Sequence, residues 1–185
     1  MRRVAQLARD IVRGRYGGVH ELFLVAGAKP PLLIWNPTAA NLRSRRLIAL
    51  LSRWNGLRDS GDRPPLASRW SLAELGPLAA YTMLLGVEAH GHDIDFVYLH
   101  YGNGIARHYG EDLSGRRLSA IAGHIAVFSS SVYRAVVLRQ EPLFSEHEAP
   151  RHVFVRHWQR VLLPLRDDAG RIARVVVGSI PEDPI

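Results

Sequence analysis

The C-terminal part of the chain contains the feature that most constrains its fold. Two runs rich in apolar and β-branched residues, 157–165 and 171–178, flank a short polar turn that ends at Gly170. Glycine can adopt the positive φ that a bulged hairpin connection needs. The pattern therefore predicts an antiparallel hairpin. Because an isolated hairpin is barely stable, it must pair with further strands or lie under a helix.

Other segments of the sequence can supply these partners. Residues 82–89 and 94–101 alternate as the strands of a second hairpin, and residues 143–148 form a further short strand. A longer helix is predicted over about residues 121–140, with helical turns before it. Its expected buried face comprises Ile121, Ile125, Phe128, Val132, Ala135 and Val136. Runs of strands on either side of a helical block predict an α+β fold with an antiparallel sheet and helices on one face.

The N-terminal part reads as helices separated by irregular chain. Residues 2–13 have the spacing of a basic amphipathic helix, which we expect to pack on the domain; the alternative is a membrane-surface or targeting helix. Residues 21–28 are predicted to form a short strand and residues 30–40 a linker, because prolines interrupt the latter. A second helix is expected over residues 42–57.

A capping box is predicted to start one more short helix before the hairpin of residues 82–101. Ser71 and Glu74 have the spacing in which the two side chains satisfy free N–H groups at a helix N-terminus. That helix should run to about residue 80.

The positive charge is confined to the front of the chain. Residues 1–60 carry a net charge of +8 and residues 61–185 a charge of −1, within a total of +7. An interaction with nucleic acid or an anionic surface is therefore plausible only for the N-terminal third. Its candidate residues are Arg43, Arg45, Arg46 and Arg53.

The composition excludes several classes of protein. The chain has no cysteine, which removes disulfides, thiolate metal sites and flavin–cysteine photochemistry. No apolar run approaches the roughly 18 residues that a membrane span requires. We therefore expect a cytoplasmic protein without a membrane span.

The residues after the second predicted hairpin carry a family resemblance. A strand over residues 96–101 is followed by Gly102-Asn103-Gly104, a helical turn to Gly110, and Gly115 a few polar residues later. This pattern, together with the closing hairpin, resembles a PAS domain, and in particular small bacterial proteins that are little more than one such domain. The resemblance covers about residues 41–180, after a basic segment over residues 1–40 and before a tail over residues 181–185.

The resemblance implies a five-stranded antiparallel sheet whose concave face, covered by helices, encloses a ligand pocket or a filled core. The aromatic residues expected there are Tyr98, Tyr101, Phe128, Tyr133 and Trp158, and the alternative is that they simply fill the core. Arg107, His124 and Arg160 are the candidate polar anchors for an anionic ligand. Haem-binding PAS domains take an axial histidine from the long helix, so His124 is also the candidate haem ligand; the alternative is a histidine bonded beside the core.

No catalytic or metal-binding set stands out. His90, His92, His147, His152 and His157 are candidate metal ligands, but His90 and His92 lie in a predicted turn. Nucleotide-binding and nucleophile motifs are absent, and Ser129 to Ser131 lie in the middle of a predicted helix. We therefore expect no enzymatic activity and leave the cofactor unassigned.

The sequence thus favours a sensory PAS-like protein that binds a small molecule or a protein partner. Dimer contacts are predicted along one face of the helix over residues 42–57, at Leu47, Leu50, Leu51 and Trp54. The sequence ends where the last strand does, so we expect signals to leave through the N-terminal helices or a separate signalling protein. Binding of nucleic acid through the arginine-rich third is the alternative function.

Overall fold

A computed structural model describes residues 2–59, 63–91, 93–149, 153 and 155–182. The α-helices and strands are α1 (Arg2–Val12), α2 (Gly17–Val25), β1 (Leu32–Trp35), α3 (Arg45–Gly56), β2 (Thr82–His90), β3 (Asp93–Tyr101), α4 (Asn103–Tyr109), α5 (His124–Arg139), β4 (Leu143–Glu148), β5 (His157–Arg166) and β6 (Ile172–Glu182). Short 3₁₀ segments are η1 (Ala39–Asn41), η2 (Ala67–Arg69), η3 (Ala73–Tyr81) and η4 (Leu118–Ala120).

The strands form one antiparallel sheet in the order β1-β4-β5-β6-β2-β3. Both predicted hairpins are present, and Gly170 has the positive φ (81°) that the closing turn requires. Strands β2 to β6 and the helices between β3 and β4 form the predicted PAS-like α+β arrangement. The sheet has six strands and not five, because β1 pairs with the edge of β4.

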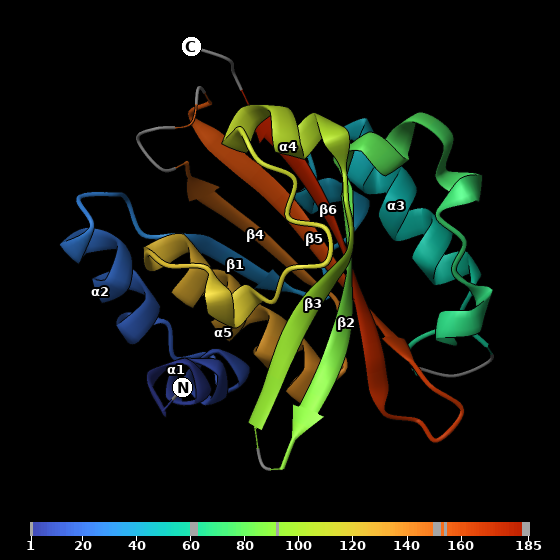
Figure 1. The fold of residues 1–185 in the computed structure, drawn as a ribbon, viewed down its shortest axis with the longest axis horizontal. Helices are drawn as coiled ribbons and strands as arrows, with labels where there is room; N and C mark the ends of the chain where they lie inside the picture. The colour runs from blue at the N-terminus through green and yellow to red at the C-terminus, as the bar shows by residue number, and fades with distance from the viewer. Residues whose placement is uncertain (1, 60–62, 92, 150–152, 154, 183–185) are drawn as a thin grey trace.

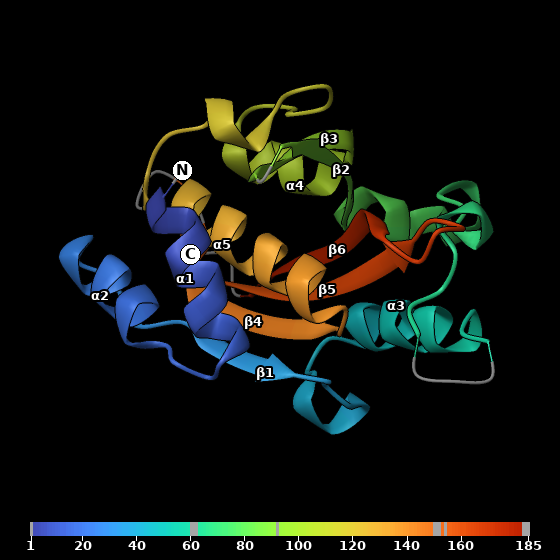
Figure 2. The same ribbon diagram turned by 90° about the horizontal axis from the view of Figure 1, so that it is seen from below.

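Helices cover both faces of this sheet (Figures 1 and 2). On the face that we call inner, α5 lies across the strands and α1 and α2 pack beside it, sharing a core with alternate residues such as Leu85, Leu162 and Val175. On the outer face, α3 packs on β5 and β6. Sequence analysis placed helices on one face only, and α3 is the exception.

The described residues of the N-terminal segment belong to the same body as the sheet. Leu7, Ala8 and Ile11 of α1 are buried against α5, as expected of a helix that packs on the domain. Buried residues of α1, α2 and β1 therefore share the inner core with the rest of the chain.

Two predictions for this segment are wrong. Residues 17–25 form helix α2 and not a strand, because Val19, Leu22 and Phe23 at helical spacing all reach the core. The expected linker over residues 30–40 contains β1, whose residues Leu32 to Trp35 pair with Glu146 to Leu143 of β4. The exposed edge of β4 thus decides the structure of a segment that its own prolines leave undetermined.

The segment before β2 also differs from the prediction. Residues 73–81 form a 3₁₀ segment that is interrupted at Gly76 (φ 52°), and no side chain caps its start. The predicted capping box of Ser71 and Glu74 is therefore absent. Glu74 instead forms an ion pair with Arg53 of α3.

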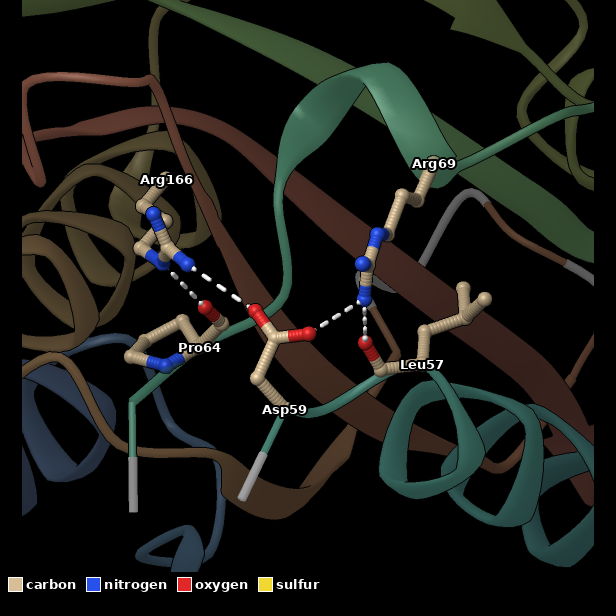
Figure 3. A network of polar contacts seen from close by, with 5 residues as sticks. All are labelled: Leu57, Asp59, Pro64, Arg69 and Arg166. Carbon is tan, nitrogen blue, oxygen red and sulfur yellow. Dashed lines mark hydrogen bonds and ion pairs between the residues drawn. The ribbon is translucent and has the colours of Figure 1, made fainter. Parts of the chain in front are cut away.

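A polar network fixes the chain after α3 to the end of β5 (Figure 3). One carboxylate oxygen of Asp59 lies 2.6 Å from Nη1 of Arg69, and the other lies 3.2 Å from Nη2 of Arg166. Nε of Arg166 donates to the carbonyl of Pro64 at 2.9 Å. Asp59 and Pro64 are therefore linked to the end of β5 by contacts between residues far apart in sequence.

Candidate ligand site

A cavity of about 190 Å³ lies between the inner face of the sheet and the segments from α4 to α5. Its polar lining consists mainly of the hydroxyls of Tyr98, Tyr101, Tyr109 and Tyr133, with Ser129 and Arg160. Apolar side chains of β2, of the segment between α4 and α5, and of α5 complete the wall: Met83, Leu113, Leu118, Ile121, Ala122, Ile125 and Ala126. The cavity is therefore an aromatic and apolar space with a few convergent polar groups, as binding sites for small molecules are.

Strand periodicity places Arg160 in this space. On β5, Trp158, Arg160 and Leu162 share one face, and Trp158 and Leu162 belong to the inner core. Arg160 is 4% exposed. Its Nη1 donates to Oγ of Ser129 at 3.0 Å, and its Nη2 lies 3.5 Å from the hydroxyl of Tyr109, at the limit of a hydrogen bond.

The charge of Arg160 has no carboxylate partner among the described residues. Burial lowers the pKa of the guanidinium, but the surrounding tyrosines outweigh it, and the pKa is raised. Arginine stays protonated in proteins in any case. Burial in turn raises the pKa of Tyr98, Tyr101 and Tyr109, so these phenols are neutral and provide no negative charge.

Further unpaired polar atoms lie in the same layer of the sheet. Ser145 of β4 and Ser179 of β6 are the direct cross-strand neighbours of Arg160. Both hydroxyls are buried and make no hydrogen bond within the described part of the chain, and the same holds for Nε of Arg160. Two residues further along, Nε1 of Trp158 and both ring nitrogens of His147 are likewise buried and make no hydrogen bond within the described part of the chain.

Such a concentration of unpaired buried groups is unusual, since most buried polar atoms in proteins have a partner. The layer is rich in donors: guanidinium, indole and hydroxyl groups. His147 is neutral, because burial and then the charge of Arg160 hold its pKa well below the usual range. Of the residues in this layer, Arg160 is the one that also lines the cavity, among the described residues.

The predicted ligand residues divide into two groups. Tyr98, Tyr101, Tyr133 and Arg160 line the cavity together. Trp158 does not line the cavity, but its ring stacks on that of Tyr109, with ring centroids 5.4 Å apart. Phe128 is a core residue that packs edge-on against Phe23 and His147.

Arg107 and His124 do not line the cavity. Arg107 is exposed on α4. His124, the candidate haem ligand, is half-buried at the start of α5 with its ring 5.4 Å from that of Phe23, and burial lowers its pKa. His124 therefore lies where the alternative interpretation expects it, beside the core.

Sequence reasoning did not assign Tyr109 and Ser129 to the site. Both follow from helical spacing: Tyr109 lies four residues after the buried Ile105, and Ser129 lies four residues after Ile125 and before Tyr133. The roles of Ser145 and Ser179 depend on strand register, which pairs them with Arg160.

The candidate metal ligands that the structure describes do not form a cluster. In the part of the chain that the structure describes, no three histidine or acidic side chains gather as metal ligands. His92, His152 and the side chain of His90 lie outside the described residues. His147 faces the inner core, where its ring contacts aromatic side chains.

The predicted dimer contacts lie in the outer core of a single chain. Leu47, Leu50, Leu51 and Trp54 are at most 5% exposed, and Nε1 of Trp54 donates to the carbonyl of Pro164 at 2.8 Å. These four side chains are therefore occupied by packing on β5 and β6. Self-association itself stays a prediction.

The arginines proposed for nucleic-acid binding are mostly engaged within the chain. Arg43 forms ion pairs with Glu146 and Glu182, and Arg53 pairs with Glu74. The Arg46 guanidinium lies over the ring of Tyr81, 4.5 Å from its centroid. Arg45 is exposed.

The fold and the cavity together define an α+β protein with a PAS-like sheet and a cavity against its inner face. No protein-family model and no curated protein matches the chain. Among solved structures, it is similar to an RNA-binding light-oxygen-voltage receptor, with a TM-score of 0.40 and 16% identity. The match covers 82% of this chain and 38% of that receptor chain, little more than a third of its length. None of the helices in the described residues is long and apolar enough to cross a membrane.

Proposed function

We propose that this protein is a sensory module that binds a small molecule in the cavity between α5 and the sheet. The observation that carries the proposal is the cavity of about 190 Å³, whose lining includes the buried guanidinium of Arg160 without a carboxylate partner among the described residues. A ligand that accepts hydrogen bonds and carries negative charge would compensate the desolvation of this cation. The role is one of binding and not of catalysis.

A route from this cavity to the rest of the molecule supports a sensory role. Ser129 and Tyr133 reach the cavity from α5, and α1 packs along the same helix. A second cavity of about 330 Å³ lies between these two helices and β3, and it shares Leu118, Ile121 and Ala126 with the first. A ligand that shifts α5 would therefore act directly on α1 or on a protein partner that contacts it.

Native mass spectrometry of freshly purified protein, with an absorption spectrum, tests the proposal. We expect a bound small molecule in the wild type, and the same measurement reports whether the protein is a homodimer. Ala126→Phe should reduce the bound fraction by filling the wall of the cavity. Ala120→Phe, at an exposed position outside the cavity lining, is the matched control.

Circular dichroism must first show that both variants fold. The proposal is wrong if Ala126→Phe and Ala120→Phe retain ligand equally. It is equally contradicted if the wild type carries no ligand and a broad metabolite screen finds none that raises its melting temperature.

A further inference from the structure

We infer that the ligand of this cavity is a small monocarboxylate with a compact apolar or aromatic body, paired with the guanidinium of Arg160. This inference rests on the proposed binding function and adds the chemical class of the ligand. The three steps that lead to it concern the charge, the donors of the guanidinium and the shape of the cavity.

The first step is the sign of the charge. A buried cation without a counter-ion is costly, because its hydration is lost and nothing replaces it. The lining includes tyrosine and serine residues, and burial raises the pKa of Tyr98, Tyr101 and Tyr109, so these three phenols are not ionised. An anion both neutralises Arg160 and accepts hydrogen bonds from it, whereas a cationic ligand would do neither.

The second step is the geometry of the unused donors. Nη1 of Arg160 donates a hydrogen bond to Oγ of Ser129 at 3.0 Å. Nε has no partner within the described residues, but it is fully buried and the cavity does not reach it. Nη2 has only the long 3.5 Å contact to Tyr109, so its N–H groups can still donate to a carboxylate oxygen in a charge-assisted hydrogen bond.

The third step is the space around the guanidinium of Arg160. Single-charge anions fit, because one arginine provides the positive charge of the lining. Glu111, the one acidic side chain in that lining among the described residues, is exposed and paired with Arg116. Glu111 would repel a second negative charge on a ligand in the cavity. Tyrosine rings and the side chains of Leu118 and Ile125 leave an apolar volume for the body of the ligand.

Calorimetric titration with benzoate and with benzamide tests the inference. The two probes share a shape and differ in charge. For the wild type we expect benzoate to bind at least roughly tenfold more tightly than benzamide, which corresponds to about 1.4 kcal/mol. Inorganic phosphate and phthalate, which carry more charge, should bind more weakly than benzoate.

Substitution of Arg160 gives the second arm. Arg160→Met should lose at least roughly tenfold in benzoate affinity and leave benzamide unchanged, while Arg160→Lys, which keeps the charge without the fork, should fall between. Arg171→Met, at an exposed arginine of the closing hairpin, is the control for loss of one charge. The ligand-free Arg160→Met protein should also melt at a higher temperature than the wild type, because a buried unpaired charge has been removed.

The outcomes separate the inference from the function on which it rests. Equal affinity for benzamide and benzoate, or full benzoate affinity in Arg160→Met, overturns the carboxylate and leaves small-molecule binding intact. Tighter binding of phosphate than of benzoate overturns it in favour of a phosphate group. If no probe binds while native mass spectrometry finds a ligand without a carboxylate, the inference fails alone; if neither method finds a ligand, both fail.

Discussion

At the scale of single residues, the inner layer of the sheet combines a permanent charge with a neutral histidine. His147 is 2% exposed, and neither ring nitrogen has a hydrogen-bond partner among the described residues. Burial is the main reason why its pKa is well below the usual range, and the charges of Arg160, His124 and His157 act in the same direction. The folded protein therefore resists protonation at this position.

This resistance predicts a loss of stability in mild acid. In the unfolded chain His147 titrates near the ordinary value of about 6.5. Below that pH the unfolded state binds a proton that the folded state does not, so the free energy of unfolding is undiminished above about pH 6.5 and declines as pH falls toward the folded pKa. The limiting slope for one proton is about 1.4 kcal/mol per pH unit.

Urea unfolding of the wild type and of His147→Leu, over a series of pH values below 7, measures this slope. The variant removes both unpaired nitrogens, so we expect it to be as stable as the wild type at neutral pH or more so. Its pH slope should be shallower but not zero, because burial also lowers the pKa of His124. Identical slopes for the two proteins would show that His147 is not the source.

At the scale of secondary-structure elements, the approach of α3 to the sheet depends on one glycine. A Cβ atom at Gly178 of β6 would lie 2.5 Å from Cδ1 of Leu50 and 2.8 Å from Cδ2 of Leu47. The helix can pack this closely because position 178 has no side chain. Gly178→Ala should therefore destabilise the protein by about 1–3 kcal/mol through overpacking.

A double-mutant cycle tests the contact. Leu50→Ala alone should cost about 2–5 kcal/mol through the cavity that it leaves. In the double variant the added methyl group enters part of that space, so the combined loss should be smaller than the sum of the two. Gly56→Ala, where a Cβ atom meets nothing within 4 Å, is the control and should be neutral or slightly stabilising. Additive losses would contradict the proposed contact.

The elements that sequence predicted correctly are those with a long or clearly periodic pattern. The strands of both hairpins and helix α5 belong to this group, and their residues have a regular hydrophobic repeat. Residues 22–25 are a short continuous apolar run, which fits a strand as well as a helix. Contacts of Phe23 with Phe128 and His147 decide for the helix, and they are formed by residues more than a hundred positions away.

The same distinction holds for the candidate site. Aromatic residues of β3 and α5 could be assigned from the family resemblance, whereas Arg160 was one of three candidate anchors, with Arg107 and His124. The long, exposed side chain of Arg107 could not be separated from Arg160 by residue type, since both are arginines beside predicted strands or turns. Register and helix rotation make the difference, and these are properties of the assembled sheet.

At the scale of the whole molecule, residues of the basic N-terminal segment are tied into the fold at several points. Ile11 is fully buried against the inner core, and its carbonyl lies 3.4 Å from Nε1 of Trp35 on β1. The guanidinium of Arg139, at the end of α5, lies over the ring of Trp35 and also contacts the carbonyl of Val12. The two cores on opposite sides of the sheet are thus connected through shared strands.

These connections predict that the chain unfolds as one cooperative unit. Ile11→Ala should cost about 2–5 kcal/mol, because it opens a cavity between α1 and α5. If unfolding is cooperative, the most protected amides in α3, on the far face of the sheet, should exchange faster. The opening free energy calculated from their exchange should fall by the same amount as the free energy of unfolding. Arg3→Ala, at an exposed position of α1, should leave this exchange unchanged. Faster exchange confined to α1 and α2, with α3 unaffected, would instead show that the N-terminal segment unfolds on its own.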